Sequence, residues 1–342
     1  MWTDSGYAYA KASWLIGKSF MGKRMSSLKG IHTLNELDRN IFPDLYRELP
    51  GRELLPDLER RIVKRSVRHI LSIVNSFLQP PKLLVRLLKG IEYSGFVECL
   101  GSIAGGKTEL PIISNIGRFG TIRFDAFPDV GAMLRKTDFE HLLSQELRSV
   151  KKGMELVDIE TKLDHRYYQG LIDSLSQLEA EDREIAARLI ADEISIRNCL
   201  WVIRIRTYYN KSEAETAKYI MNINMFGKVS QKRATLCAEA RSSLHFSLDV
   251  REDWRGWRWE KFLNEEGTAA HWKIDPRHFQ NAASKYLHHL YLRHFHSSPM
   301  SVSAFYCFIK LKLYEEDLLT SVAEGLSLGI SSSKVFDLLE VS

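Results

Sequence analysis

The stretch VRHILSIVNSFLQPPKLLVRLLKGIEY (67–93) decides the fold class. Its first half repeats apolar residues at intervals of three and four, which places them on one face of an α-helix. Two consecutive prolines, Pro80 and Pro81, end that helix, because proline has no amide hydrogen and clashes with the preceding turn. A second apolar series follows the prolines. The two series are Val67, Ile70, Leu71, Val74, Phe77 and Leu78, and then Leu83, Leu84, Leu87, Leu88 and Ile91. The stretch therefore predicts two helices joined by a short break.

The same periodicity covers most of the remaining chain. It recurs from Glu181 onward and again near the end, at Ile185, Leu189, Ile190 and Ile194, and at Phe305, Phe308, Ile309 and Leu313. Ser212 and Glu215 form a capping box, which predicts a helix start. Only IRIR (203–206) alternates like a strand, and it lies within a long helical window. We therefore expect an all-α protein.

One segment, Gly105 to Pro128, departs from this pattern. It holds four glycines and the prolines Pro111 and Pro128, and it shows no helical period. Glycine and proline in this density favour turns over regular structure. We predict a linker or a long ordered loop here.

Composition limits the classes of protein that remain. The 342 residues are enough for two or three domains, and the formal net charge of +5 is mild. The four cysteines are far apart, which favours buried thiols in a reduced protein over a disulfide framework or a zinc site. The N-terminal segment contains Asp4 and two lysines, so we expect no signal peptide. No apolar run approaches the roughly 20 residues of a membrane span.

A weak internal repeat suggests three related domains. LLKGIEY (87–93), VIRIRTY (202–208) and FIKLKLY (308–314) share an aliphatic residue, a basic residue and a tyrosine four positions later. The basic positions are Lys89, Arg204 and Lys310. The copies lie about a third of the chain apart, which is too long for a solenoid period. We predict helical domains at 1–112, 113–228 and 229–342.

The octapeptide GSIAGGKT (101–108) matches the phosphate-loop pattern G-x-x-x-x-G-K-[ST]. A functional loop of this kind follows a buried strand and opens a helix, so that phosphate meets the helix N-terminus. Here the preceding residues predict a helix, and Pro111 would break the helix that should follow. We interpret the match as a glycine-rich turn. A nucleotide-binding enzyme remains the alternative.

Two further segments have a possible chemical role beside a structural one. HHLYLRHFH (288–296) places only His289 and His296 on one face, without an acid between them, which favours a basic helix surface over a metal site. WRGWRWEKF (254–262) interleaves arginines with three tryptophans. It would stack on nucleic-acid bases, or else its tryptophans pack a core while the arginines reach solvent. The balanced charge favours the core, and a helical nucleic-acid-binding module is the second alternative.

No G-x-S-x-G or H-E-x-x-H motif occurs, and no nucleophile is obviously paired with a base. We therefore expect no catalytic residue, no cofactor and no metal site. Taken singly, each of Lys89, Arg204 and Lys310 is best explained as a solvated or ion-paired charge on a helix surface.

Several segments together resemble a known family. YAYAKASWLIGKSF (7–20) is similar to the opening of the C subunit of V-type (A/V-type) ATP synthases, the counterpart of the d subunit of the eukaryotic vacuolar ATPase. EISIRNCLWVIRIRTYYNKSEAE (193–215) resembles the most recognisable segment of that family, and LLKGIEYSGFVE and FYCFIKLKLYEEDLL resemble its first and third repeats. The similarity extends over essentially the whole chain. Ser195 stands where an aspartate is expected in the family.

The resemblance implies three similar helical domains around a pseudo-threefold axis, in the shape of a funnel. It implies a non-catalytic central-stalk subunit that links the rotating shaft of the soluble head to the membrane rotor ring. Its partners would be the shaft subunits and the ring, without nucleic acid and without a membrane span of its own. It would lie on the cytoplasmic face of the membrane. Because a threefold body places equivalent residues at equivalent radii, we predict that the repeated basic residues Lys89, Arg204 and Lys310 line the funnel and contact the shaft.

Overall fold

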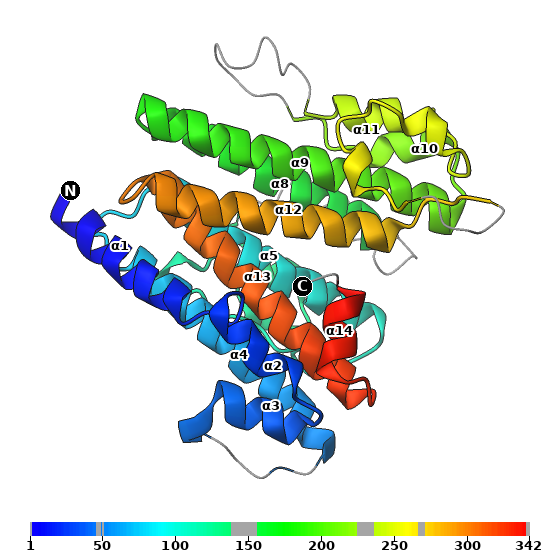
Figure 1. Ribbon diagram of the computed structural model, residues 1–342. Helices are drawn as coiled ribbons and strands as arrows, with labels where there is room; N and C mark the ends of the chain where they lie inside the picture. Colours follow the sequence, from blue (N-terminus) through cyan, green and yellow to red (C-terminus); the bar gives the residue numbers. More distant parts are fainter. Residues whose placement is uncertain are drawn as a thin grey trace. The chain divides into compact units, whose positions relative to one another are not determined.

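The computed structural model describes residues 2–45, 49, 51–137, 156–223, 236–265 and 271–339. Every regular element in these ranges is a helix, and no strand occurs among them (Figure 1). Long helices form the frame, and shorter helices and 3₁₀ turns connect them. The predicted all-α class is therefore confirmed over the described ranges.

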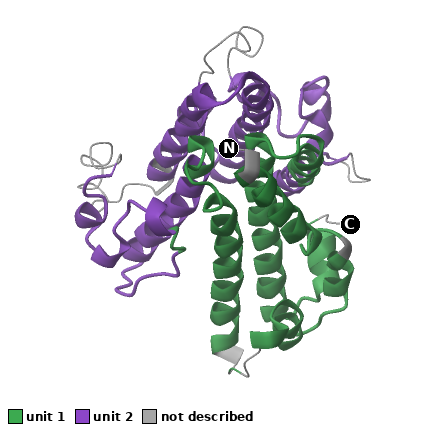
Figure 2. Ribbon diagram, turned by 90° about the vertical axis from the view of Figure 1, so that its left-hand side faces the viewer, with its two compact units in different colours: residues 1–85, 114–116, 285–342 green, residues 86–113, 117–284 purple. Residues whose placement is uncertain are grey.

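The chain divides into two compact units, each containing segments that are distant in sequence (Figure 2). Unit 1 comprises residues 1–85, 114–116 and 285–342, and unit 2 comprises residues 86–113 and 117–284. The boundaries fall inside two long helices, α5 (Lys82–Ala104) and α12 (Pro276–Ser297). The predicted division into three domains remains a prediction.

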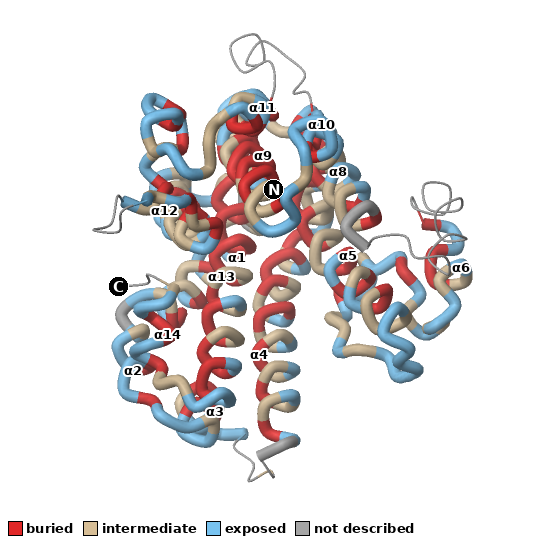
Figure 3. Tube along the Cα trace, turned by 90° about the vertical axis from the view of Figure 1, so that its right-hand side faces the viewer, coloured by how far each residue is buried: buried red, intermediate tan, exposed pale blue. Residues whose placement is uncertain are grey.

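Unit 1 is built on the pair α4 (Gly51–Val74) and α13 (Val302–Ser327), which lie side by side with their buried residues facing inward (Figure 3). Leu58 and Ile62 of α4 share one apolar core with Leu319 and Val322 of α13. Four shorter helices pack around this pair: α1 (Trp2–Gly17), α2 (Ser26–Lys29), α3 (Leu34–Ile41) and α14 (Ser332–Leu338). The pairing joins segments that are far apart in the sequence.

Unit 2 is organised around α9 (Ala180–Tyr209), the longest helix described. The helices that lie wholly in this unit besides α9 are α6 (Val130–Met133), α8 (Leu156–Ser174), α10 (Glu213–Thr216) and α11 (Ala238–Ser243), and most of α5 and the start of α12 belong to it as well. The IRIR segment lies inside α9, so its alternation does not form a strand, and α10 begins with the predicted capping box. In the capping box Ser212 and Glu215 each satisfy the other's backbone amide.

The glycine-rich segment after α5 is an ordered loop that packs against α5. It contains two 3₁₀ turns, Gly117–Phe119 and Phe124–Ala126. Ile122 is buried in one core with Tyr93, Phe96 and Leu100 of α5. Outside this loop, the described chain has 3₁₀ turns at Lys23–Met25, Pro43–Leu45, Leu175–Gln177, Ala217–Tyr219, Arg251–Trp254 and Glu260–Phe262. The predicted long loop is thus confirmed, and its packing explains its order.

The predicted break at the two prolines is also confirmed, with a small difference in its start. α4 ends at Val74 rather than at Leu78, and α5 begins at Lys82. Leu78 is 88% exposed, because it lies in the turn between the helices rather than on their buried face. Among the described helices, none combines the length and the apolar character needed to cross a bilayer.

Candidate functional site

Lys89, the first of the three repeated basic residues, holds the glycine-rich loop against α5. Its ammonium group donates to the Glu92 carboxylate at 2.8 Å, to the Phe119 carbonyl at 2.7 Å and to the Thr121 hydroxyl at 2.8 Å. The buried Glu92 in turn accepts hydrogen bonds from the backbone amides of Thr121 and Ile122. The three ammonium hydrogens of Lys89 are therefore matched by three internal acceptors.

Arg204, the second repeated position, lies on α9 and donates to the side-chain oxygen of Gln280 on α12. It is half-buried, and desolvation lowers the pKa of its guanidinium group below the ordinary arginine value. Lys89 and Arg204 belong to unit 2, but their side chains contact different neighbours.

Lys310, the third position, lies on α13 in unit 1 and is only 8% exposed. Its ammonium nitrogen is 5.7 Å from the centroid of the Tyr306 ring, within cation–π range. All three repeated basic residues therefore have partners within their own unit.

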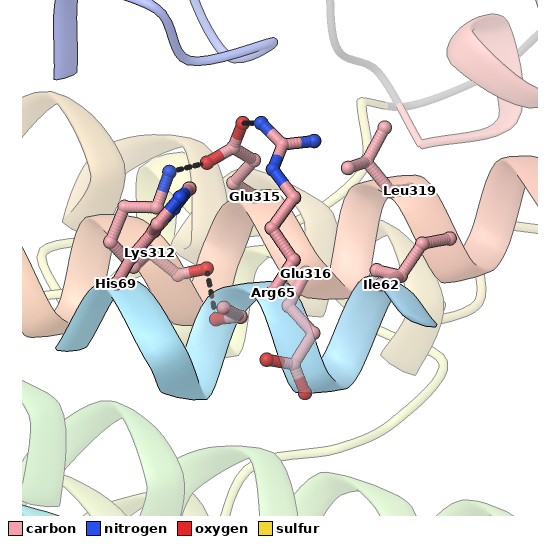
Figure 4. A pocket seen from close by; sticks show the side chains of 8 residues that line it. Ile62, Arg65, His69, Lys312, Glu315, Glu316 and Leu319 are labelled. Atoms are coloured by element: carbon pink, nitrogen blue, oxygen red, sulfur yellow. Dashed lines mark hydrogen bonds and ion pairs between the residues drawn. The ribbon is translucent and has the colours of Figure 1, made fainter. Parts of the chain in front are cut away.

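A recess in unit 1 gathers several charged side chains from two helices (Figure 4). α4 contributes Arg65 and His69, and α13 contributes Lys312 and Glu315. The Glu315 carboxylate bonds to the Lys312 ammonium group and lies 3.5 Å from the Arg65 guanidinium. It also accepts the backbone amide of Phe20 at 2.9 Å. This carboxylate thus joins α4, α13 and the segment after α1.

The electrostatics of the recess keep His69 neutral. Burial and the nearby positive charges of Lys312 and Arg65 lower the pKa of His69 to about 4. Its Nδ1 is buried and has no hydrogen-bond partner among the described atoms. Lys312 is also desolvated, which lowers its pKa although Glu315 opposes the shift. Buried charges are tolerated when opposite charges are in contact, as they are here. The cluster therefore serves to hold α4, α13 and the segment after α1 together.

The phosphate-loop match does not have phosphate-loop geometry. Gly101–Ala104 form the last turn of α5, so the segment closes a helix rather than opening one. The Gly106 amide donates to the Ile103 carbonyl at 3.0 Å, the Lys107 amide donates to the Ser102 carbonyl at 2.9 Å, and Gly106 has φ +70°. These bonds define a Schellman C-cap. The backbone amides of Gly106 and Lys107, which would have to bind phosphate, donate instead to helix carbonyls. The loop also follows the C-terminal end of α5, whose partial charge is negative and repels an anion. The geometry therefore contradicts the nucleotide-binding alternative.

The tryptophan-rich segment packs a core, as the structural interpretation predicted. Trp254, Trp257 and Trp259 are between 0% and 7% exposed. Trp257 stacks on Phe279 and Trp259 on Phe262, whereas Trp254 meets Phe246 edge to face. Their indole nitrogens donate to the Ser247 carbonyl, the Glu239 carbonyl and the Ser195 hydroxyl. Buried rings offer no face to a base. The nucleic-acid-binding alternative therefore loses the residues on which it depended.

The histidines of α12 are not arranged as metal ligands. His288 is half-buried and lies beside the Tyr314 ring, and desolvation lowers its pKa to about 4. The His289 ring nitrogen lies 2.7 Å from the Lys285 carbonyl oxygen. In the parts of the chain that the structure covers, no group of three or more potential ligands could hold a metal ion.

Two contacts that no sequence pattern indicated fasten α9 to distant backbone segments. Asn198 is fully buried and grips the backbone of Met221, donating to its carbonyl at 3.1 Å and accepting from its amide at 2.9 Å. Arg206 donates to the carbonyls of Ser243 and Phe246 at 2.7 and 2.9 Å. Asn198 and Arg206 both bind backbone groups that are distant in the sequence. The one sequence signal for such contacts is a polar residue on an otherwise apolar helix face.

Together these contacts define a class of protein: a helical body whose charged and amide side chains fasten its own helices and loops. The comparison with known proteins then identifies the family. Residues 34–337 match the family model of the ATP synthase (C/AC39) subunit. Because that match spans most of the chain, the protein belongs to this family.

Two relatives extend the comparison. An uncharacterized protein of Treponema pallidum (strain Nichols) is 26% identical over 326 residues, covering 94% of this chain and 92% of the relative. The C subunit of the A-type ATP synthase of Methanosarcina acetivorans is 24% identical over 262 residues. That alignment covers 75% of this chain and 65% of the archaeal protein. The resemblance in the sequence is therefore confirmed at the level of the family.

Proposed function

We propose that this protein is a non-catalytic central-stalk subunit of a rotary V-type ATPase or ATP synthase. It links the rotating shaft of the soluble head to the membrane rotor ring, and it transmits torque between ATP chemistry and ion transport. Its partners are the shaft subunits and the ring subunits, and it acts at the cytoplasmic face of the membrane as a peripheral part of the complex.

The observation that carries this proposal is the family match over residues 34–337. The relative from Methanosarcina acetivorans, which is named as the C subunit of an A-type ATP synthase, supports the same role. The construction of the units is compatible with it. Long helices joined by buried ion pairs and backbone clamps, as at Glu315 and Asn198, resist deformation. A torque-transmitting part needs such stiffness within each unit.

We further propose Lys89, Arg204 and Lys310 as contacts with the shaft. Each has an internal partner, so a shaft contact would be made in addition to that bond or in exchange for it. Arg204 is the most available of the three, since its partner is a single neutral side chain, Gln280. Complementary charge across such an interface mainly gives orientation and specificity.

Co-purification tests the proposed function. The tagged full chain, expressed in its native cell, is expected to retain shaft subunits and ring subunits after detergent extraction. Cells that lack the chain are expected to keep ATP hydrolysis by the soluble head but to lose ATP-driven ion transport in membrane vesicles. Recovery of the tagged chain without any rotary-ATPase subunit, together with normal transport in the deletion strain, would overturn the proposal.

A further inference from the structure

The N-terminal part of unit 1 carries an unusual concentration of positive charge. Between Asp4 and Glu36 the chain contains five lysines and arginines and no acidic residue. That charge equals the formal net charge of the whole protein, +5. The bases are Lys11, Lys18, Lys23, Arg24 and Lys29. Among the side chains that the structure describes, Lys11, Lys18, Arg24 and Lys29 form no ion pair. Their charge therefore remains to be neutralised from outside these residues.

Within this segment lies α1 (Figure 1), whose sequence alternates aromatic residues and lysines at helical spacing up to its end. Tyr7 is followed by Lys11 and Trp14 by Lys18, so an aromatic residue and a lysine four positions later occur twice at a spacing of seven. This spacing places Tyr7, Lys11 and Trp14 on one stripe of the helix, and Lys18 follows directly after its last residue. Each ammonium nitrogen lies near the preceding ring, at 5.9 Å from the Tyr7 centroid and at 4.1 Å from the Trp14 centroid.

The rings of the stripe are exposed, although another face of the same helix is buried. Tyr7 is 63% exposed and Trp14 is 58% exposed, whereas Ala8, Ala12 and Leu15 pack α1 against the rest of unit 1. The helix is therefore held by its small and aliphatic residues, and the two large rings are left to face solvent.

The cations of the stripe differ in their anchoring. Lys11 donates to the Ser72 carbonyl at 3.1 Å, so it is held at one end of the stripe. Lys18 is exposed, and the exposed Arg24 donates to the Lys18 carbonyl at 3.1 Å, which fixes a second cation beside it. We call Tyr7, Lys11, Trp14, Lys18 and Arg24 the α1 stripe.

We propose that the α1 stripe contacts the surface of a bilayer that contains anionic phospholipid. Tyrosine and tryptophan are enriched where an apolar layer meets water, and lysine and arginine near them bind lipid phosphates. A folded helix with rings and cations on one exposed stripe matches that boundary in both chemistries. An acidic protein surface would match the cations but would leave two large rings without an apolar layer. The inference rests on the proposed function only for bringing the chain beside a membrane.

Sedimentation of the full chain with lipid vesicles tests the inference. Vesicles of phosphatidylcholine alone and of phosphatidylcholine with about 30% phosphatidylglycerol would be compared at low and high salt. We expect binding to the anionic vesicles and its loss at high salt, since the surface potential is screened within a Debye length. Each basic side chain near an anionic surface raises partitioning by about fivefold. The variant Lys18→Gln/Arg24→Gln is therefore expected to bind roughly 25-fold more weakly.

Trp14→Ser and Tyr7→Ser test the apolar half of the stripe and are expected to weaken binding while leaving the melting temperature unchanged. Tyr209→Ser, at an exposed tyrosine on α9 that is 62% accessible, is the matched control and is expected to bind as the parent does. Failure of the parent to bind anionic vesicles, or equal binding by Trp14→Ser and the parent, would overturn the inference.

Loss of the shaft subunits from Trp14→Ser, without loss of vesicle binding, would assign the stripe to an acidic protein partner and would also overturn the inference. Co-purification of the parent with shaft and ring would still stand in that case. The membrane contact and the proposed function therefore fail separately.

Discussion

The indole nitrogen of Trp259 donates to the hydroxyl oxygen of Ser195 at 3.0 Å, although the two residues are separated by 64 positions. Trp259 is 2% exposed and Ser195 is 4% exposed, so neither group reaches solvent instead. This bond connects the tryptophan-rich core to the middle of α9. It also gives Ser195, which departs from the aspartate expected in the family, a structural role in this chain.

Ser195→Ala is expected to lower the free energy of unfolding by about 1–3 kcal/mol, because it leaves a buried indole donor without this partner. Chemical denaturation followed by circular dichroism measures the change. In a double-mutant cycle with Trp259→Phe, the second substitution should cost less when Ser195 is already alanine. Strictly additive costs would show that the hydrogen bond contributes nothing.

Asn198→Ala is expected to destabilise unit 2 by about 2–3 kcal/mol, since two hydrogen bonds to the Met221 backbone are lost in a buried setting. Asn198→Asp keeps the acceptor for the Met221 amide but places a carboxylate against the Met221 carbonyl. It is therefore expected to be at least as damaging as alanine. Thermal melts of both variants beside Asn281→Ala, which replaces an asparagine on α12, provide the measurement. A melting temperature unchanged in Asn198→Ala would contradict the clamp.

These two residues show what the sequence could and could not predict. Periodicity at Val67–Leu78 and at Leu83–Ile91 predicted both helices, because it depends only on spacing along one helix. It also predicted a core from Trp254, Trp257 and Trp259. The partners of Ser195 and Asn198 depend on packing between distant segments, and helical spacing carries no information about that packing.

Two substitutions in the C-cap after α5 distinguish a structural role of this loop from nucleotide binding. Gly106→Ala is expected to cost about 1 kcal/mol of stability, because its φ of +70° suits glycine and strains alanine. Lys107→Ala should leave ATP hydrolysis by the assembled complex nearly unchanged. Its backbone amide, which closes the cap, is kept in that variant. A tenfold loss of hydrolysis in Lys107→Ala, which corresponds to about 1.4 kcal/mol of barrier, would show that the segment binds nucleotide after all.

The recess of unit 1 predicts a pH dependence of stability. The pKa of His69 is about 4 in the folded protein, against 6.5 ordinarily, because of burial and the charges of Lys312, Arg65 and Arg68, with Glu315 opposing. The unfolded chain therefore binds more protons at this site below pH 6.5, and stability falls as the pH drops from about 6.5 toward about 4. His69→Gln should flatten this part of the profile of melting temperature against pH.

His288 also titrates in this range, so the difference between the parent and His69→Gln is the quantity that matters. His288 has a pKa lowered to about 4 and acts in the same direction as His69. Parallel profiles for the parent and His69→Gln would show that His69 binds protons equally well in the folded and unfolded states.

The candidate contact residues mark a second limit of sequence reasoning. The repeat of an aliphatic residue, a basic residue and a later tyrosine selected Lys89, Arg204 and Lys310, but it did not separate a contact surface from repeated packing. The structure adds internal partners for each. The loop carbonyl of Phe119 that binds Lys89 lies 30 residues away, and no local pattern announces it.

Coupling between the shaft and the ring depends on how firmly the chain holds the shaft. If the three basic residues contact the shaft, weak contacts on one rigid part reinforce each other. Each single substitution, Lys89→Gln, Arg204→Gln or Lys310→Gln, should weaken shaft binding by at most about 1 kcal/mol. Glutamine is preferred to charge reversal because a glutamate at position 89 would face Glu92 and release the loop. The triple substitution should detach the shaft, so that ATP hydrolysis continues without ion transport.

Arg206→Gln is the matched control for this experiment. It removes a positive charge two positions from Arg204 on another face of α9, and it breaks bonds to the Ser243 and Phe246 carbonyls. It should lower the melting temperature while preserving coupling below that temperature. The readouts are ions moved per ATP hydrolysed in reconstituted vesicles and recovery of shaft subunits in a pull-down. If the triple variant folds, retains the shaft and pumps normally, the three residues serve only the internal contacts that the structure shows, even though the family assignment stands.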